Sequence, residues 1–304
     1  MTRKSSASSA SSEAARERFA DFAAGADEAI DLAEAALCIA AEHVEFDMPA
    51  CLAQLADLAD RARPALERIA TRPLAERVDR FNQHMFRDEG FRGCEQHDYY
   101  QPRQSFLNEV LERRSGIPIS LSIVYVDVSR RLGLRSFGVS FPGHFLAKID
   151  PDSASPRSEP AHAGDDSIIV DPFIGRALSR DECSDRLERA IGPQADLNPD
   201  SASQWLAAAS PREILVRVLG NLKQNYLACE DWPAALACAD RSLLLLPDSP
   251  LELRDRGLLY RKLECFGAAV DDLERFLELA PQHESAAVAR DSLSAMRRHP
   301  RTIH

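Results

Sequence analysis

A 34-residue period in the last third of this 304-residue chain constrains its fold more than any other feature. Similar residues recur at that interval in four pairs: Tyr226 and Tyr260, Ala235 and Ala269, Trp232 and Phe266, and Pro247 and Pro281. Self-similarity at a fixed period of about 20–50 residues is typical of stacked units, each of which buries its apolar face against its neighbours. The period therefore predicts a helical repeat domain.

A period of 34 residues is that of the tetratricopeptide repeat, a helix-turn-helix unit. We predict repeats over about 216–249 and 250–283, followed by a capping helix, in a domain spanning 210–298. Two repeats fall short of the roughly three needed for independent stability, so we expect them to pack on the preceding domain. The first helix of each repeat carries basic residues that we expect to bind an acidic protein or peptide partner, with intramolecular packing as the alternative. These residues are Arg217, Arg254, Arg261 and Lys262.

The composition argues against several classes of protein. Asp and Glu number 48 against 37 Lys and Arg, and the resulting net charge of −11 disfavours a nucleic-acid partner. No apolar run approaches the ~20 residues of a membrane-spanning helix, so we expect no membrane association. The seven cysteines form no C-x-x-C pair and no Cys/His cluster, so we expect no disulfide framework, no metal site and no cofactor. Residues 1–25 are serine-rich without a secretory signal and predict a disordered tail on a cytoplasmic protein.

The middle of the chain predicts a small α+β layer. Apolar residues at helical spacing fill 26–68, and a further helix is expected to start at Pro118 and to end at Gly133. Strand-like stretches follow at 137–141, 144–150 and 167–173. We therefore predict a mostly helical α+β domain over 26–195 with a small antiparallel sheet, followed by the all-α repeat domain.

Two polar residues on these strands could carry chemistry. An aspartate on one strand can orient a histidine on its neighbour, and His144 and Asp171 are placed for this. The pair would then need a nucleophile at the start of the preceding helix, where the helix dipole lowers the pKa of a thiol. The alternative is a hydrogen bond that orders the two strands and has no catalytic role.

Three strings carry a resemblance to a known family. In order they are NEVLERRSGIPISLSIVYVDVSRRLGL, FPGHFLAKI and VDPF, and the repeat pair follows them. From about Ala26 to the C-terminus the chain resembles the SirB-one family, bacterial proteins with a transglutaminase-like N-terminal domain. That resemblance implies a core related to papain-type cysteine proteases, with a cysteine on the helix, a histidine on the next strand and an aspartate on the one after. His144 and Asp171 match the last two positions.

The cysteine position is not matched. It falls near Pro118, and the nearest cysteine in the sequence is Cys94. Because proline has nothing to ionise, we expect a degenerate transglutaminase-like fold that serves as a non-catalytic regulatory or protein-interaction protein. The alternative is a hydrolase or acyl transferase of the transglutaminase/cysteine-protease type that uses Ser120 or Ser122 as nucleophile. A serine hydroxyl within about 3.2 Å of His144 would favour that enzyme.

Overall fold

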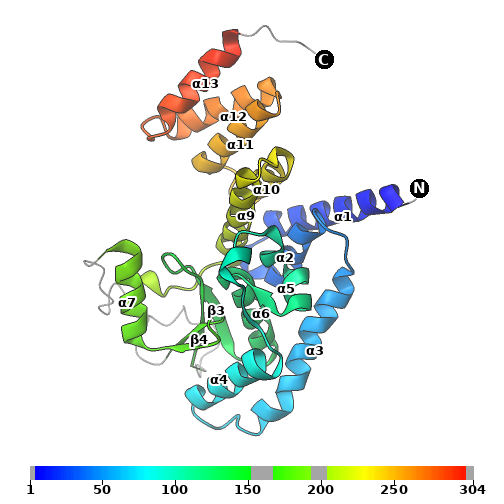
Figure 1. Cartoon of the computed structure of the whole chain (residues 1–304), viewed down its shortest axis with the longest axis vertical. Coiled ribbons are helices and arrows are strands. Elements are labelled where there is room, and N and C mark those ends of the chain that lie inside the picture. The colour runs from blue at the N-terminus through cyan, green and yellow to red at the C-terminus, as the bar shows by residue number, and fades with distance from the viewer. Residues whose placement is uncertain (1–3, 152–166, 193–203, 299–304) are drawn as a thin grey trace. The chain divides into compact units, whose positions relative to one another are not determined.

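A computed structural model describes residues 4–151, 167–192 and 204–298 of the chain (Figure 1). The chain forms two compact units: Met1–Phe22 with Asp27–Ile214, and Ala23–Ala26 with Leu215–His304. Within the described ranges, none of the helices is both long enough and apolar enough to cross a bilayer.

The first unit is built mainly from helices. They are α1 (Lys4–Ala24), α2 (Leu32–Ala41), α3 (Met48–Glu67), α4 (Leu74–Asn82), α5 (Leu107–Arg113), α6 (Pro118–Arg131) and α7 (Arg180–Ile191). A π-helical segment, η2 (Gln83–Asp88), follows α4, and short 3₁₀ segments lie at Asp27–Ala29, Gln96–Asp98 and Pro102–Gln104. The carboxylates of Asp31 and Asp47 accept backbone N–H groups at the starts of α2 and α3, as N-cap residues do.

Helix α1 differs from the disordered tail that the sequence predicts for residues 1–25. The helix continues to Ala24, and its Arg16 and Arg18 form ion pairs with Glu42 and Glu34 of the first unit. Ala15, Phe19 and Phe22 are buried and recur at steps of four and three residues. An apolar stripe at this spacing lies on one face of a helix, and its burial outweighs the serine-rich composition of the residues before it.

A four-stranded antiparallel sheet lies beside α6. Its strands are β3 (Arg135–Val139), β4 (Leu146–Asp150), β5 (Ile168–Asp171) and β6 (Arg176–Leu178), in that spatial order. On one face, the Ser129 hydroxyl of α6 donates to the Ser136 hydroxyl of β3 at 2.6 Å. Apolar residues of the sheet and of the turn after β3 form a buried cluster with Cys183 and Leu187 of α7. The predicted α+β class with a small antiparallel sheet is therefore confirmed.

The strand boundaries differ from the prediction by about two residues. Residues 141–144 form the turn between β3 and β4, because His144 N donates to the carbonyl of Phe141 and Gly143 takes a positive φ of 67°. His144 thus precedes β4 and does not open it. Strand β6 has three residues and no sequence pattern of its own. A further two-residue pair, β1 (Arg92–Gly93) with β2 (Ser115–Gly116), runs parallel.

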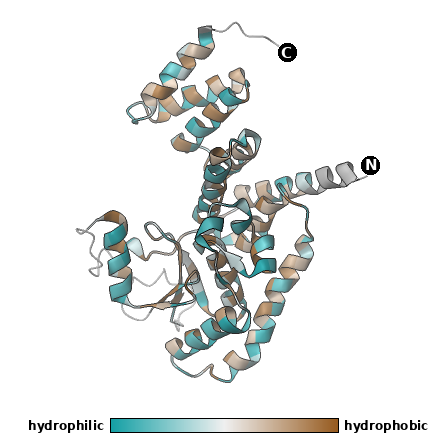
Figure 2. Cartoon of the chain, in the orientation of Figure 1, coloured by the Kyte–Doolittle hydropathy of each residue, from teal (hydrophilic) through white to brown (hydrophobic). Residues whose placement is uncertain are grey.

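The second unit is a stack of helical hairpins. It contains most of α9 (Pro211–Ala228), and then α10 (Trp232–Leu245), α11 (Pro250–Lys262), α12 (Phe266–Leu279) and α13 (Ala286–Arg298). Figure 2 shows that these helices carry both hydrophobic and hydrophilic residues. Their core includes Leu253, Leu273 and Phe276. Gly257 permits the close approach of α12, since a Cβ atom there would lie 2.8 Å from Cγ of Leu273. The repeat architecture predicted from the 34-residue period is confirmed.

Candidate functional site

The structure brings His144 and Asp171 together. His144 lies in the turn before β4 and Asp171 ends the neighbouring strand β5. Nε2 of His144 is 3.0 Å from Oδ2 of Asp171. The carboxylate is fully buried, whereas the histidine side chain is 19% exposed. The pair therefore joins a buried charge to a side chain that reaches the surface.

Three further groups hold the Asp171 carboxylate. Nη1 of Arg186, on α7, lies 2.8 Å from Oδ2. The backbone N–H groups of Phe173 and Ile174 donate to Oδ1 at 2.9 and 3.4 Å. Burial acts to raise the pKa of Asp171, but the contacts with His144, Arg186 and the Phe173 N–H outweigh it, and the pKa lies below its ordinary value. The carboxylate is therefore ionised at neutral pH and has several cationic or N–H partners.

Arg186 is the site residue that the sequence analysis missed. It lies between Cys183 and Leu187, which turn the apolar face of α7 toward the sheet. Helical spacing could have shown that Arg186 borders this buried face. The identity of its partner, 15 residues earlier in the chain, depends on how α7 packs.

The start of α6 holds no ionisable side chain where the resemblance implies a cysteine. Ile117, Pro118 and Ile119 are all buried. The Ser120 hydroxyl donates to the carbonyl of Gln104 at 2.6 Å and also contacts the Ile117 carbonyl at 3.1 Å. The Ser122 hydroxyl is fully buried, and in the described part of the chain it has no hydrogen-bond partner. Neither hydroxyl is hydrogen-bonded to His144 there.

Cys94 lies near this site in space. Its backbone N–H donates to the carbonyl of Gly116, just before α6, and the N–H of Gly93 donates to the carbonyl of Phe173, just after Asp171. The Phe173 ring packs edge-on against His144, with 6.1 Å between ring centroids. However, burial raises the pKa of the Cys94 thiol, and the charges of Asp98 and Glu95 raise it further. A buried thiol with a raised pKa is a poor nucleophile.

Comparison with known proteins identifies the family. A model of the transglutaminase-like superfamily matches residues 49–220, more than half of the chain, and a tetratricopeptide-repeat model matches residues 222–294. The UPF0162 protein of Xylella fastidiosa strain Temecula1 is 38% identical over 272 residues, which cover 88% of this chain and 90% of that protein. The chain belongs to the transglutaminase-like UPF0162 family.

Other relatives, named UPF0162 protein or SirB1, match over much of the chain. The Vibrio cholerae protein is 31% identical over 270 residues, or 88% of this chain and 93% of its own length. Protein SirB1 of Salmonella typhimurium is 27% identical over 200 residues, or 66% of this chain and 68% of its own length. These matches confirm the resemblance to the SirB-one family. No solved structure gives a significant match.

The basic residues predicted to bind a partner in this UPF0162 protein make contacts within the repeat unit. Nη1 of Arg254 donates to the Ser285 hydroxyl at 3.0 Å, and Nη1 of Arg261 donates to the Ser292 hydroxyl at 2.9 Å. Nζ of Lys262 lies 5.0 Å from the centroid of the Trp232 ring. Arg217 is half-buried on α9. These four residues are called the basic strip below.

A lysine outside the basic strip links the first helices of the two repeats, α9 and α11. Lys223 of α9 is 3% exposed, and its Nζ lies 2.7 Å from both the Glu252 and the Asp255 carboxylates of α11. The sequence analysis did not single out Lys223, because its carboxylate partners lie 29 and 32 residues away. In the described part of the chain, no group of three or more His, Cys, Asp or Glu residues is arranged to hold a metal ion.

Proposed function

We propose that this UPF0162 protein is a non-catalytic, regulatory protein-interaction protein built on a degenerate transglutaminase-like fold. The observation that carries the proposal is the start of α6, where buried Ile117, Pro118 and Ile119 offer no nucleophile, although the His144–Asp171 pair is formed. The pair is held by Arg186 and by backbone N–H groups, as expected for a contact that orders β4, β5 and α7.

The contacts of the two serines argue against the enzymatic alternative. An activated serine hydroxyl has to donate to the general base and to face the substrate. The Ser120 hydroxyl instead donates to a backbone carbonyl, and Ser122 is fully buried. Using either residue would require the first turns of α6 to move away from the core.

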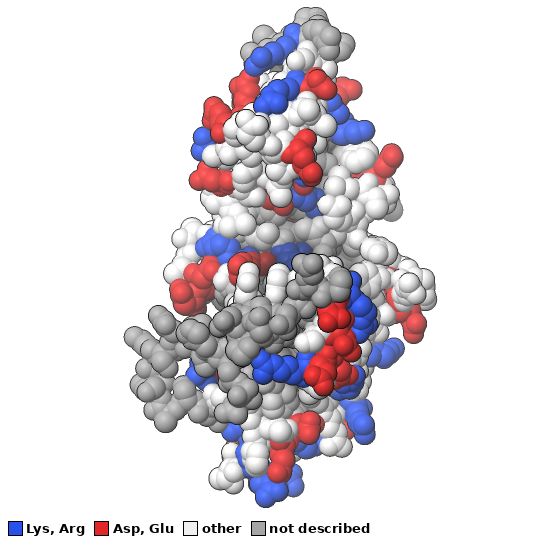
Figure 3. All heavy atoms as spheres, turned by 90° about the vertical axis from the view of Figure 1, so that its left-hand side faces the viewer, with Lys and Arg blue, Asp and Glu red and all other residues white. Residues whose placement is uncertain are grey.

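We propose that the repeat unit binds an acidic peptide segment through the basic strip. Arg261 donates to the neutral Ser292 hydroxyl, and Nη1 of Arg254 donates to the neutral Ser285 hydroxyl, while its Nε and Nη2 pair with Asp255. At each serine a partner's carboxylate would be a stronger acceptor, because charge-assisted hydrogen bonds are about twice as strong as neutral ones. Replacing the hydrogen bond to each serine hydroxyl by one to a carboxylate of the partner would therefore be favourable. On the face shown in Figure 3, basic and acidic residues are interspersed, which is unlike the single-sign surface that holds nucleic acid.

We also propose a cytoplasmic location. None of the seven cysteines, all of which lie in the described part of the chain, forms a disulfide. Free thiols, including the exposed Cys229 and Cys265, suit a reducing compartment better than an oxidising one. We propose no cofactor.

Active-site probes test the non-catalytic part of the proposal. The intact protein is incubated with a fluorophosphonate, which labels activated serines, and is assayed for amine incorporation into a glutamine-containing protein. We expect neither signal to exceed that of a His144→Ala variant. Labelling or transfer that disappears in His144→Ala and in Ser120→Ala or Ser122→Ala would show that the site is an enzyme.

A titration with a model peptide tests the binding part. Fluorescence anisotropy follows a fluorescein-labelled hexaglutamate peptide, with hexalysine as the reference, at several salt concentrations. We expect the Arg254→Ala, Arg261→Ala double variant to weaken hexaglutamate binding about tenfold or more, and binding to weaken as salt rises. The matched control is Arg275→Ala, an exposed arginine on α12. Equal binding by wild type and the double variant would rule out the basic strip as the peptide site.

A further inference from the structure

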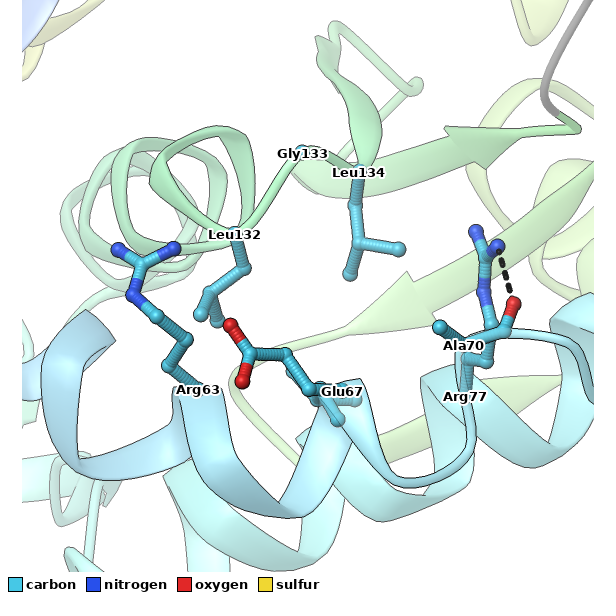
Figure 4. A pocket seen from close by; sticks show the side chains of 8 residues that line it. Arg63, Glu67, Ala70, Arg77, Leu132, Gly133 and Leu134 are labelled. Atoms are coloured by element: carbon cyan, nitrogen blue, oxygen red, sulfur yellow. Dashed lines mark hydrogen bonds between the residues drawn. The ribbon is translucent and has the colours of Figure 1, made fainter.

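A small cavity of about 160 Å³ lies in the first unit, where α3 and α4 meet the turn from α6 to β3. Figure 4 shows the side chains that line it. They are Arg63, Leu66, Glu67, Ala70, Arg77, Leu132, Gly133 and Leu134. The cavity shares no lining residue with the His144–Asp171 site.

Three leucines make up the apolar part of the cavity wall. Leu132 and Leu134 point from the turn toward α3 (Figure 4), and Leu66 of α3 belongs to the same lining. An enclosed apolar cavity of about 150 Å³ can hold benzene, and the cavity here has a similar volume but a partly charged wall. Its leucine-lined part therefore has room for a branched aliphatic group of about four to six carbon atoms.

Two opposite charges lie one helical turn apart at the cavity. Arg63 and Glu67 are at positions i and i+4 of α3, a spacing at which such side chains ordinarily pair with each other. Here Nη2 of Arg63 instead contacts the Asp60 carboxylate at 3.2 Å and the Arg131 carbonyl at 3.3 Å. Glu67 is exposed, and its carboxylate makes no ion pair or hydrogen bond within the described part of the chain. The carboxylate points toward Leu132 (Figure 4).

We propose that this cavity binds an aliphatic α-amino acid as its zwitterion. The ammonium group would pair with Glu67 and the carboxylate with Arg63, while the side chain would fill the space between the leucines. An α-amino acid carries its ammonium and carboxylate groups on the same carbon atom, so both groups can reach two side chains that lie one helical turn apart. Arg77 closes another side of the cavity, where its Nη1 lies 3.5 Å from the carbonyl of Ala70.

The ligand can be tested one chemical group at a time. The intact protein is titrated with L-leucine by isothermal calorimetry and by saturation-transfer NMR. Three comparators each lack one group: isocaproic acid (4-methylpentanoic acid) lacks the ammonium, isoamylamine lacks the carboxylate and glycine lacks the side chain. We expect leucine to bind at least about tenfold more tightly than each comparator, a difference of about 1.4 kcal/mol.

Two variants connect that binding to the cavity. Glu67→Gln should weaken leucine binding about tenfold and leave isocaproic acid binding unchanged. Ala70→Phe places a ring at an exposed lining position and should abolish binding of leucine without disturbing the core. The control is Glu112→Gln, an exposed carboxylate outside the cavity.

Three results would overturn the proposal. One is a leucine affinity no greater than that of glycine or of isocaproic acid. The second is unchanged leucine binding by Glu67→Gln, since the ammonium would then not meet this carboxylate. The third is full binding by Ala70→Phe, which would place leucine elsewhere on the protein.

Discussion

Replacing Asp171 by asparagine tests whether the His144–Asp171–Arg186 cluster holds the first unit together. The two side chains have nearly the same shape, and the asparagine Oδ1 can still accept the N–H groups of Phe173 and Ile174. The other carboxylate oxygen is replaced by an NH₂ group, which cannot accept a hydrogen bond. This group would face Arg186 and His144, which lie 2.8 and 3.0 Å from the native oxygen.

The expected loss of stability follows from the burial of these groups. Removing one partner of a buried ion pair costs about 3–5 kcal/mol, because the remaining charge is left without compensation. Arg186 and His144 are 23% and 19% exposed, so water replaces part of the lost interaction. We therefore expect Asp171→Asn to lower the free energy of unfolding of the first unit by about 2–3 kcal/mol. That corresponds to roughly 4–12 °C in the melting temperature of a unit of this size.

The two tryptophans allow each unit to be followed separately. Trp205 packs against the apolar cluster of β3 to β6 in the first unit, and Trp232 begins α10 in the second. In a Trp232→Phe background, Trp205 fluorescence during urea unfolding reports on the first unit. The control is Asp185→Asn, an exposed carboxylate next to Arg186. A loss below about 0.5 kcal/mol, the size of an ordinary surface substitution, would refute the stabilising role.

The pH dependence has a definite sign. The pKa of Asp171 is lower in the folded protein than the ordinary value of about 3.9. Its contribution to stability is therefore complete above the unfolded pKa and is lost as the pH falls through the folded pKa. The difference between wild type and Asp171→Asn should be full above pH ~5 and should shrink below pH ~4. A difference that grows with acidity would contradict this account.

Three other predictions use matched pairs within the chain. Ser120→Ala should lower the free energy of unfolding of the first unit by about 1 kcal/mol, because the Ser120 hydroxyl donates to the Gln104 carbonyl. Ser122→Ala removes a buried hydroxyl that has no partner in the described part of the chain, so it should be neutral or stabilising in the same urea assay. Gly257→Ala should lower the free energy of unfolding of the second unit by about 1–3 kcal/mol, because the new Cβ would lie 2.8 Å from Cγ of Leu273. Gly267→Ala should raise it by up to about 1 kcal/mol, because a Cβ at Gly267 meets open space. Trp232 fluorescence separates these two outcomes. Native thiol titration at pH 8 should modify the exposed Cys229 and spare Cys38, whose pKa burial raises to about 12; equal rates would contradict the burial.

The sequence was sufficient to predict the periodic elements. The 34-residue period places the helices α9 to α13, and Pro118 and Gly133 bracket α6, which the structure shows at Pro118–Arg131. These predictions succeed because the spacing of apolar residues depends on which face of a helix is buried, and that spacing can be seen within one short segment of the sequence. An apolar pattern at helical spacing is also present at Phe19 and Phe22, although the serine-rich composition of residues 1–25 favours a disordered segment.

The partners of charged side chains could not be predicted in this way. Arg186 meets Asp171 because α7 packs against the sheet, and Arg254 and Arg261 meet serines that lie 31 residues further along the chain. Arg63 turns to Asp60 and to Arg131, although Glu67 stands at the spacing that local rules favour. Such choices depend on burial and on the geometry between elements distant in sequence. The residue pattern thus determines the helices and the repeat, and the packing of those elements determines which charges meet.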